Sequence, residues 1–390
     1  MKRILLIVPA MLAVITAAAV AQNINPDISV VGDIRAFTTN NPEDPKEDKL
    51  QLDLESVELA LQGYLNPFVR ADVYISYHDG SFEVEEAYAT ILRGLPGGLQ
   101  LRAGKYRVDF GKLNLLHPHA YSFLDTPLLH QAYLGEEGLN DIGVNLNWQL
   151  PLGDAALTLS GNVLKGDFAK PHEHGHTEHQ HAHSATGLWR RGGLAAHGHE
   201  QHSVQTDLGY SQRLSLFLPT ATYAGVEFGA NALQGKLDTL TGREVRLLGA
   251  DVKYRWAPDK YRSLTVQGEW IRSKRDVHHH HHHEAIGRLD EEHEPEGVER
   301  VSADGFFAFF DWRFAQRYNM GAIFERFDHP EEAHVTRKRA GVFAGFQVME
   351  ESTILRLLLR RSEGTGMGSS VREAILQLVF SLGPHKAHWF

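Results

Sequence analysis

The stretch Leu139-Asn140-Asp141-Ile142-Gly143-Val144-Asn145-Leu146-Asn147-Trp148-Gln149 alternates apolar and polar side chains. Its apolar members, from Ile142 to Trp148, occupy every second position and oppose asparagine and glutamine. Because successive side chains of a β-strand point to opposite faces, such a strand presents one apolar and one polar face. The pattern is typical of a sheet that has lipid on one side and water on the other.

The same alternation recurs along nearly the whole chain of 390 residues. A membrane-spanning strand needs roughly 9 to 11 residues or slightly more, and the alternating stretches have this length. The sequence therefore predicts an all-β fold, a transmembrane antiparallel β-barrel of about 16 strands, enough to enclose an aqueous channel. The predicted strands are 27–37, 51–64, 67–78, 82–93, 98–110, 139–149, 154–165, 203–217, 221–234, 242–257, 261–275, 299–315, 317–328, 335–349, 352–363 and 370–383.

Short and long connections alternate between these strands. Every second connection is a short turn, such as Leu65-Asn66-Pro67 or Pro219-Thr220, and the segments 111–138, 166–202 and 276–298 are long. In outer-membrane barrels short turns face the periplasm and long loops face the outside. The alternative all-β fold is a soluble β-sandwich. A single sandwich of this length, with strands that end in aromatic residues such as Trp312 and Phe314, is unusual.

The N-terminus has the pattern of an export signal. A basic start at Met1-Lys2-Arg3 precedes an apolar stretch, residues 4–18, and the small-residue site Ala19-Val20-Ala21. We expect residues 1–21 to be a cleavable signal peptide and 22–390 to form the outer-membrane barrel of a Gram-negative bacterium. An uncleaved membrane anchor is disfavoured because the apolar stretch is short.

Charge and composition exclude several classes of protein. The formal net charge is −10 and no basic tract occurs, which argues against nucleic acid as a partner. Because the chain has no cysteine, its stability cannot come from disulfides. We find no Ser, His and acid arrangement on the strands, so the sequence predicts no enzymatic activity and no required cofactor.

Alternation assigns a set of charged residues to the lumen. Both signs are present, and a mixed lining sets up a transverse field that orients polar solutes. Alternatively, these charges merely pair with one another in a wet lumen. The predicted pore-lining residues are Lys105, Arg107, Arg213, Lys253, Arg255, Asp311, Arg313, Arg356 and Arg360.

The segment 111–138 is too long and too apolar for a simple external loop. We expect it to fold into the barrel and narrow the channel, where His117, His119 and His130 are candidate metal ligands at the constriction. Ordinary packing of the segment is the alternative, since His-x-His beside a proline is a weak signal.

Histidine is concentrated in two predicted external loops. Neutral imidazole suits Zn²⁺, Cu²⁺ and Ni²⁺, and the ligands alone do not select among them. Protonation below about pH 6 should weaken such binding. Two alternatives remain for these histidines, an inserted purification tag for the run of six and loop filler for the rest. The candidate metal ligands are His172, His174, His176, His179, His181, His183, His197, His199, His202, His278, His279, His280, His281, His282, His283 and His293.

Several motifs resemble one family of outer-membrane proteins. They are Asn25-Pro26-Asp27-Ile28-Ser29-Val30, Val84-Glu85-Glu86-Ala87-Tyr88, Phe110-Gly111-Lys112-Leu113-Asn114, His117-Pro118-His119 and Gly135-Glu136-Glu137-Gly138, with an aromatic C-terminus at Phe390. The chain resembles barrels related to phosphate-selective porins, of the group labelled zinc-regulated TonB-dependent outer-membrane receptors. The resemblance implies a link to zinc, but the first predicted strand starts too early to leave room for the plug of a TonB-dependent receptor.

These observations predict a porin-like outer-membrane channel linked to uptake of divalent metal through the His-rich external loops, and the resemblance implies that the metal is zinc. The alternatives are a surface metal-binding barrel without an open pore, or a TonB-linked zinc receptor component that lacks a plug. The expected partners are outer-membrane lipid and small solutes or metal ions. A homotrimer is common among such porins, although the sequence shows no interface.

Overall fold

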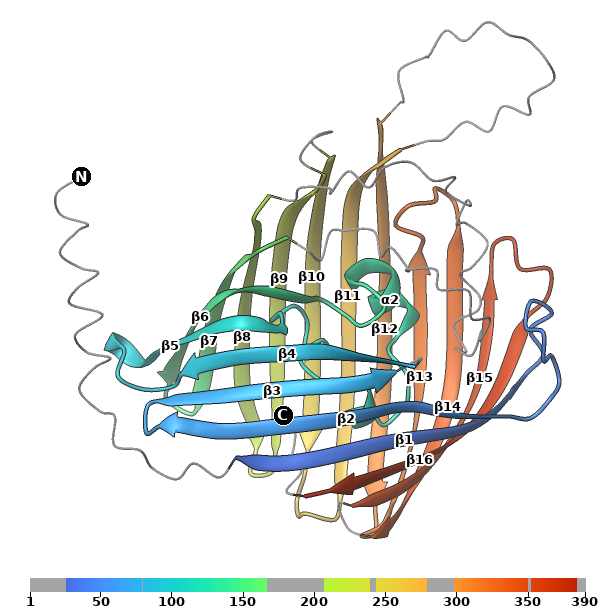
Figure 1. Ribbon diagram of the computed structural model, residues 1–390, viewed down its shortest axis with the longest axis horizontal. Helices are drawn as coiled ribbons and strands as arrows, with labels where there is room; N and C mark the ends of the chain where they lie inside the picture. Colours follow the sequence, from blue (N-terminus) through green and yellow to red (C-terminus); the bar gives the residue numbers. More distant parts are fainter. Residues whose placement is uncertain are drawn as a thin grey trace, which may run out of the picture.

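One closed barrel accounts for almost all regular structure in the chain. The computed structural model describes residues 26–78, 80–166, 207–238, 243–278, 298–349 and 352–383. In these residues sixteen antiparallel strands each pair with their neighbours in sequence, and β16 pairs back onto β1 (Figure 1). The predicted fold class and the count of sixteen strands are therefore confirmed.

The strands lie close to the predicted ranges. The described connections contain three short helices. They are the 3-10 helices η1 (Pro96–Gly98) and η2 (Pro118–Ala120) and the α-helix α2 (Leu128–Leu134). No helix of the described residues is long and apolar enough to cross a membrane. The strands are β1 (Asp27–Thr39), β2 (Gln51–Asn66), β3 (Val69–His78), β4 (Ser81–Ile91), β5 (Leu99–Arg107), β6 (Asn140–Leu152), β7 (Ala155–Leu164), β8 (Gly209–Ala221), β9 (Ala224–Asp238), β10 (Arg243–Trp256), β11 (Ser263–His278), β12 (Val298–Phe314), β13 (Tyr318–Asp328), β14 (Thr336–Met349), β15 (Thr353–Gly364) and β16 (Val371–Leu382).

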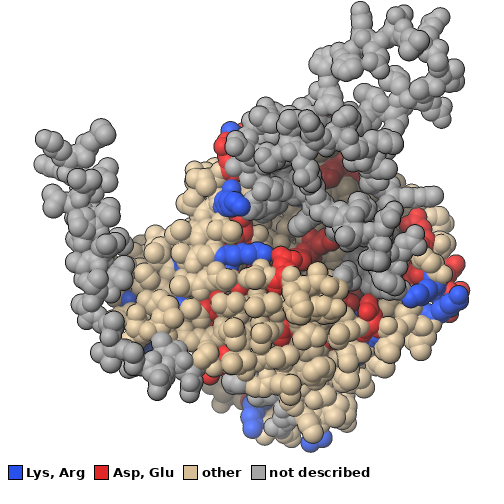
Figure 2. Space-filling view, viewed as in Figure 1, with Lys and Arg blue, Asp and Glu red and all other residues tan. Residues whose placement is uncertain are grey.

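Alternation along the strands builds an apolar outer wall. On β12, Phe306, Phe310 and Trp312 are exposed on the outside, as expected for a lipid-facing surface. On β15, Leu357 and Leu359 are also exposed on the outside, while Leu358 between them faces inward. In the space-filling view most of the visible wall is tan, and charged side chains gather near its upper rim and in the hollow behind it (Figure 2).

Most strand ends differ from the sequence prediction by a few residues, and two of these differences have a clear local cause. β8 continues through Pro219 to Ala221, so the turn falls at residues 222–223 and not at Pro219-Thr220. The register shifts between Pro219 and Ala221, and such an irregularity accommodates a residue that has no backbone N–H. β5 ends at Arg107 and not at residue 110, because the chain leaves the wall there and turns into the barrel.

Some predicted features lie outside the described residues. These are the signal peptide 1–21, the C-terminal residues 384–390, and most of the His-rich stretches within 166–202 and 276–298. The described connections agree with a barrel that has short turns at one end and long loops at the other. For example, Gly153-Asp154 joins β6 to β7, whereas residues 108–139 join β5 to β6. The β3–β4 connection at 79–80 is an exception, being short at the long-loop end.

Candidate functional site

The candidate site is the segment 108–139, which lies inside the barrel. It carries η2 and α2, and α2 lies against β12 and β13 (Figure 1). Many of its apolar side chains are buried, and Val108, Leu124 and Leu129 have no exposed surface. We call these residues the inward segment.

An apolar inner wall receives the inward segment. Phe123 packs on Phe309 of β12 with ring centroids 4.8 Å apart, and the ring of Tyr133 meets the ring of Phe327 edge-on at 6.2 Å. Burial of one such aromatic side chain contributes roughly 1.5–3 kcal/mol. The inward-facing apolar residues of the wall are Phe37, Leu233, Val245, Leu247, Ile271, Ala303, Phe307, Ile323, Phe327, Phe343, Leu358 and Ile375.

Glu269 on β11 fixes the start of the inward segment and α2 together. One of its carboxylate oxygens, Oε1, accepts hydrogen bonds from the backbone N–H groups of Lys112 (2.9 Å) and Leu113 (2.7 Å). The other oxygen, Oε2, lies 2.9 Å from Nε2 of His130. Gly111 passes this carboxylate with φ at +69°, and an added Cβ would come within 2.3 Å of Oε2. The close approach therefore requires glycine here.

Asp125 fixes the middle of the inward segment across the seam where the barrel closes. Its carboxylate pairs with Arg35 of β1 at 2.6 Å and with Arg360 of β15. Burial alone would raise the pKa of Asp125, but these two guanidinium groups lower it below its usual range. Each arginine also has a carboxylate on the wall, Asp33 for Arg35 and Glu373 for Arg360. The segment thus holds a buried, charge-compensated network.

His117 lies in a cluster of carboxylates from β2 and β4. Its Nδ1 is 2.9 Å from Glu58 and 3.0 Å from Glu85. Its Nε2 is 2.8 Å from Glu86. His119 lies beside it, with Nδ1 at 3.4 Å from Glu58. We call Glu58, Glu85, Glu86 and His117 the His117 cluster.

The protonation of His117 follows from this cluster. Burial alone would lower the pKa of His117, but the nearby carboxylates, Glu58 foremost, raise it well above the ordinary value of 6.5. At neutral pH the imidazole is therefore an imidazolium that pairs with the acids. Glu58, Glu85 and His117 each offer one ligand atom, and these atoms lie within 4.8 Å of one another. The donor set suits a divalent ion, provided that the imidazole loses its proton.

Most of the predicted pore-lining residues face inward. Arg107, Arg213, Arg356 and Arg360 are buried; Arg213, for example, contacts Asp251 at 2.6 Å. In the ladder Arg213 stands opposite inward-facing Asn231. Arg356 donates to the backbone oxygen of His119 at 3.1 Å, so this side chain also supports the inward segment. The half-buried residues on the same face are Lys253, Arg255, Asp311 and Arg313.

Lys105 departs from the prediction. In the ladder it stands opposite Ile142, whose side chain is exposed on the outer wall, and its Nζ reaches Glu83 at 2.9 Å. The adjacent Gly104 has φ at +136° and interrupts the regular alternation near this strand end. Simple counting by twos from the middle of the strand therefore assigned Lys105 to the wrong side.

The three predicted constriction histidines lie at different places. His119 lies beside His117, next to the His117 cluster, whereas His130 pairs with Glu269 and packs edge-on against Phe307 at 5.2 Å. The three therefore do not form one ligand set. Among the predicted loop ligands, His278 ends β11, and the others lie outside the described residues.

Sequence reasoning missed the acidic partners of the inward segment. Glu58, Glu86 and Glu269 face inward and bind histidines or backbone N–H groups of that segment. The pair Glu85-Glu86 could have indicated these partners. In a strictly alternating strand, one of two adjacent acids would face the lipid, so the pair indicates an irregular strand. The register is irregular there, between Tyr74 and Ile75 of the paired strand, which allows both carboxylates to reach His117.

The comparisons with known proteins agree with the barrel. No family model matches the chain. A protein of Aquifex aeolicus (strain VF5), itself uncharacterized, is 25% identical over 407 residues, which cover 94% of this chain and 80% of that protein.

Solved structures with the same fold are outer-membrane proteins. An anion-selective porin from Comamonas acidovorans superposes with a TM-score of 0.56 at 7% identity, over 92% of this chain and 100% of the porin. A loop-deletion mutant of OmpT, an outer membrane protein of Vibrio cholerae, gives 0.55 at 8% identity, over 93% and 100%. The outer membrane channel DcaP of Acinetobacter baumannii gives 0.53 at 11% identity, over 92% and 97%. At these identities the likeness establishes a porin-like outer-membrane fold.

Proposed function

We propose that this chain is a porin-like channel for small polar solutes in the outer membrane of a Gram-negative bacterium. The observation that carries the proposal is a closed sixteen-strand barrel whose lumen holds a polar-anchored inward segment. Such a segment narrows a wide barrel. The solved channels and porins of the same fold support this function, and the proposal includes no enzymatic step.

We further propose that divalent metal ions, Zn²⁺ foremost, are among the solutes. The His117 cluster offers carboxylate oxygens and an imidazole, and the His-rich stretches 172–202 and 278–293 add imidazoles at the outside in the sequence prediction. Copper and nickel fit the same ligand types. The proposed transport is passive diffusion through the lumen.

Single-channel recording in planar bilayers tests the channel. We expect discrete open steps from the folded chain, and micromolar zinc should reduce their conductance when it occupies the lumen. The variant Glu85→Gln removes one proposed ligand and should weaken the zinc effect at least several-fold, while Asp154→Asn in the β6–β7 turn should leave it unchanged. Zinc block of equal strength in both variants would count against the His117 cluster.

A second candidate, a metal-binding barrel without an open pore, is favoured by one observation. The inward segment packs a continuous apolar cluster against β9 to β16 and β1, which closes that side of the lumen. Absence of any conductance step, from protein shown to be folded by its resistance to denaturant, would support this candidate and exclude the channel.

Trimeric assembly is a further part of the proposal. A trimer form of OmpT from Vibrio cholerae shares the fold at 7% identity, with a TM-score of 0.52 over 92% of this chain and 99% of that chain. A homotrimer of this chain would show as three equal conductance steps for each insertion event.

A further inference from the structure

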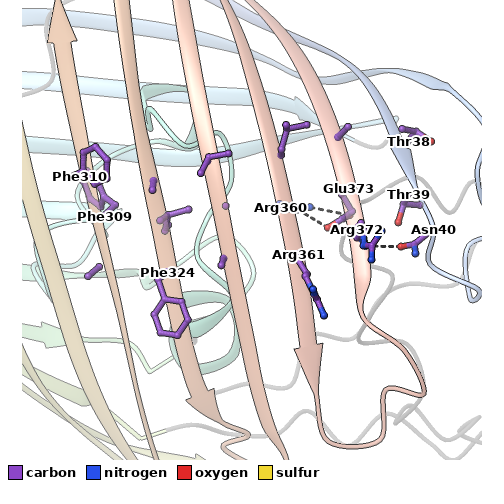
Figure 3. A pocket seen from close by; sticks show the side chains of 18 of the residues that line it. Thr38, Thr39, Asn40, Phe309, Phe310, Phe324, Arg360, Arg361, Arg372 and Glu373 are labelled. Atoms are coloured by element: carbon purple, nitrogen blue, oxygen red, sulfur yellow. Dashed lines mark hydrogen bonds and ion pairs between the residues drawn. The ribbon is translucent and has the colours of Figure 1, made fainter.

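A groove of about 1200 Å³ lies on the outer wall, where β12 to β16 meet the end of β1 (Figure 3). Outward-facing side chains line it, among them Phe310, Phe324 and Leu359, which are exposed. The wall is hollowed because several neighbouring outward positions carry only a methyl group. These small residues are Ala308, Ala322, Ala340 and Ala374.

The two ends of the groove differ in chemistry. Phe310 and Phe324 lie at the end formed by β12 and β13, next to the alanines of those strands (Figure 3). Arg361 and Arg372 lie at the other end, close to Asn40, whose side-chain oxygen accepts a hydrogen bond from the backbone N–H of Arg372 at 2.6 Å. The groove therefore has an apolar part and a basic part, as an amphiphilic ligand requires.

The basic part belongs to a larger outward-facing patch on four consecutive strands. Arg326 stands opposite Lys338, and Arg361 stands opposite Arg372. Between these two pairs Lys338 stands opposite Glu363, so Lys338 and Arg361 are diagonal neighbours in the ladder. All four are exposed. Arg361 pairs with Glu363 at 2.5 Å, whereas the other three form no ion pair with a described acid. We call these four residues the basic rim.

The basic rim lies at the level of lipid headgroups. Arg361 is three residues from the end of β15 and Arg372 is the second residue of β16, both at the barrel end that carries the long connections. In outer-membrane barrels this end faces the outer leaflet and the exterior. Below the rim the groove descends over the apolar wall that meets acyl chains.

We propose that this groove binds a phosphorylated glycolipid of the outer leaflet, with its phosphate on Arg361 and Arg372 and an acyl chain over Ala340 and Phe324. Guanidinium groups bind phosphate with two parallel hydrogen bonds, and basic side chains near a membrane surface attract anionic lipids. A second copy of the chain fits less well, since it would cover the basic rim and leave those cations to be matched by acids of the partner.

The phosphate contact is tested by lipid titration of the folded chain in detergent micelles, followed by native mass spectrometry. The probes are purified lipopolysaccharide, the same lipopolysaccharide after enzymatic dephosphorylation, and phosphatidylglycerol. We expect the double variant Arg361→Gln/Arg372→Gln to bind lipopolysaccharide about 30-fold more weakly. This estimate takes a loss of affinity of roughly five- to sixfold for each basic side chain near the membrane surface. The charge-matched control Lys260→Gln/Arg262→Gln, in the β10–β11 turn at the opposite end, should bind as the wild type does.

Three outcomes would overturn the proposal. They are equal affinity of the two double variants, equal affinity for the dephosphorylated lipid, and equal affinity for phosphatidylglycerol, which would replace the glycolipid by any anionic lipid. None of these outcomes depends on whether the barrel conducts ions. The lipid proposal is therefore tested independently of the channel function.

The acyl part of the groove needs its own variant. Ala340→Phe fills the groove from the outside, and Ala344→Phe adds the same ring lower on the outer face of β14, where it does not line the groove. We expect only Ala340→Phe to weaken lipopolysaccharide binding. If Ala340→Phe changes the oligomeric state measured by light scattering and leaves lipid binding intact, the groove is an interface between copies of the chain and the lipid proposal is wrong.

Discussion

At the scale of single residues, the lumen depends on a few charged side chains that have more than one partner. His117 contacts carboxylates from two strands, and Glu269 binds two backbone N–H groups and a second histidine. Because a buried charge is costly without compensation, removal of one member leaves the others unsatisfied. Substitutions at these positions should therefore affect the placement of the whole inward segment.

The variant His117→Gln should be destabilised in a pH-dependent way. The folded barrel raises the pKa of His117, so the protonated form stabilises the fold; this contribution is complete below about pH 6.5 and is lost as the pH rises through the raised pKa. We expect the difference in unfolding midpoint between wild type and His117→Gln, measured in urea, to shrink from pH 6 towards pH 10. His334→Gln, an exposed position in the β13–β14 connection, is the control. A difference that grows with pH would contradict the assignment.

Zinc binding at the His117 cluster should depend on pH in the opposite direction. A metal ion must displace the proton that the carboxylates hold on the imidazole, so affinity should increase as the pH rises from 6 to 8. Isothermal titration at these pH values, in buffers of different ionisation enthalpy, should show release of a proton on binding. Binding without proton release would mean that zinc does not use His117.

The variant Gly111→Ala tests the close approach to Glu269. Its left-handed backbone and the collision of the new methyl with a fixed carboxylate should together cost on the order of 2 kcal/mol or more of unfolding free energy. Gly153→Ala is a matched control, since Gly153 has φ at +66° but nothing within 4 Å of an added Cβ. Equal destabilisation of the two variants would show that Glu269 moves aside freely.

At the scale of the elements, the strands were predictable and the inner packing was not. Alternation located every strand, because each one must present a regular lipid face such as that of Phe306, Phe310 and Trp312. The apolar inner faces of β9 to β16 and β1 do not follow from alternation, since they pack against the inward segment. In the sequence this wall is indicated by adjacent aromatic residues, Phe306 beside Phe307 and Phe309 beside Phe310. One ring of each pair faces the lipid and the other faces the inward segment.

The candidate site was predictable only in part for the same reason. The unusual length and apolar content of residues 111–138 favoured an inward course, and the structure places 108–139 inside the barrel. The partners of this segment lie on strands that are distant in sequence, such as β11 for Gly111 and β15 for Asp125. A period of two identifies the face on which a residue lies but does not reveal which loop will meet it.

The variant Asp125→Asn should loosen the inward segment as a unit. Arg35 keeps the carboxylates of Asp33 and Glu55, and Arg360 keeps that of Glu373. The loss in unfolding free energy should therefore be about 2 kcal/mol, below the 3–5 kcal/mol that follows removal of the only partner of a buried charge. We expect faster proteolysis within residues 108–139 and a larger or noisier single-channel conductance. The exposed pair of Asp259 with Arg262 provides the control, Asp259→Asn. Unchanged proteolysis would show that apolar packing alone holds the segment.

At the scale of the whole molecule, nearly all pairing is between strands that follow one another in the chain. The exception is the seam between β1 and β16, where Val30 pairs with Leu382 and Thr39 with Glu373. Side chains join across it as well, since Gln377 donates to Asp33 at 2.7 Å. Asp125 spans the same region from inside, through Arg35 on one side of the seam and Arg360 on the other.

This bridge sets an order of events for biogenesis. The first and last strands are separated by almost the whole chain, and contacts of such wide sequence separation form slowly. Since the inward segment contacts both flanks of the seam, it must already occupy the interior when the two edges meet, or the interior face of the seam remains incomplete. A barrel stalled before closure would therefore carry an accessible Asp125 and an exposed edge on β1, which is the form that periplasmic chaperones and proteases would encounter.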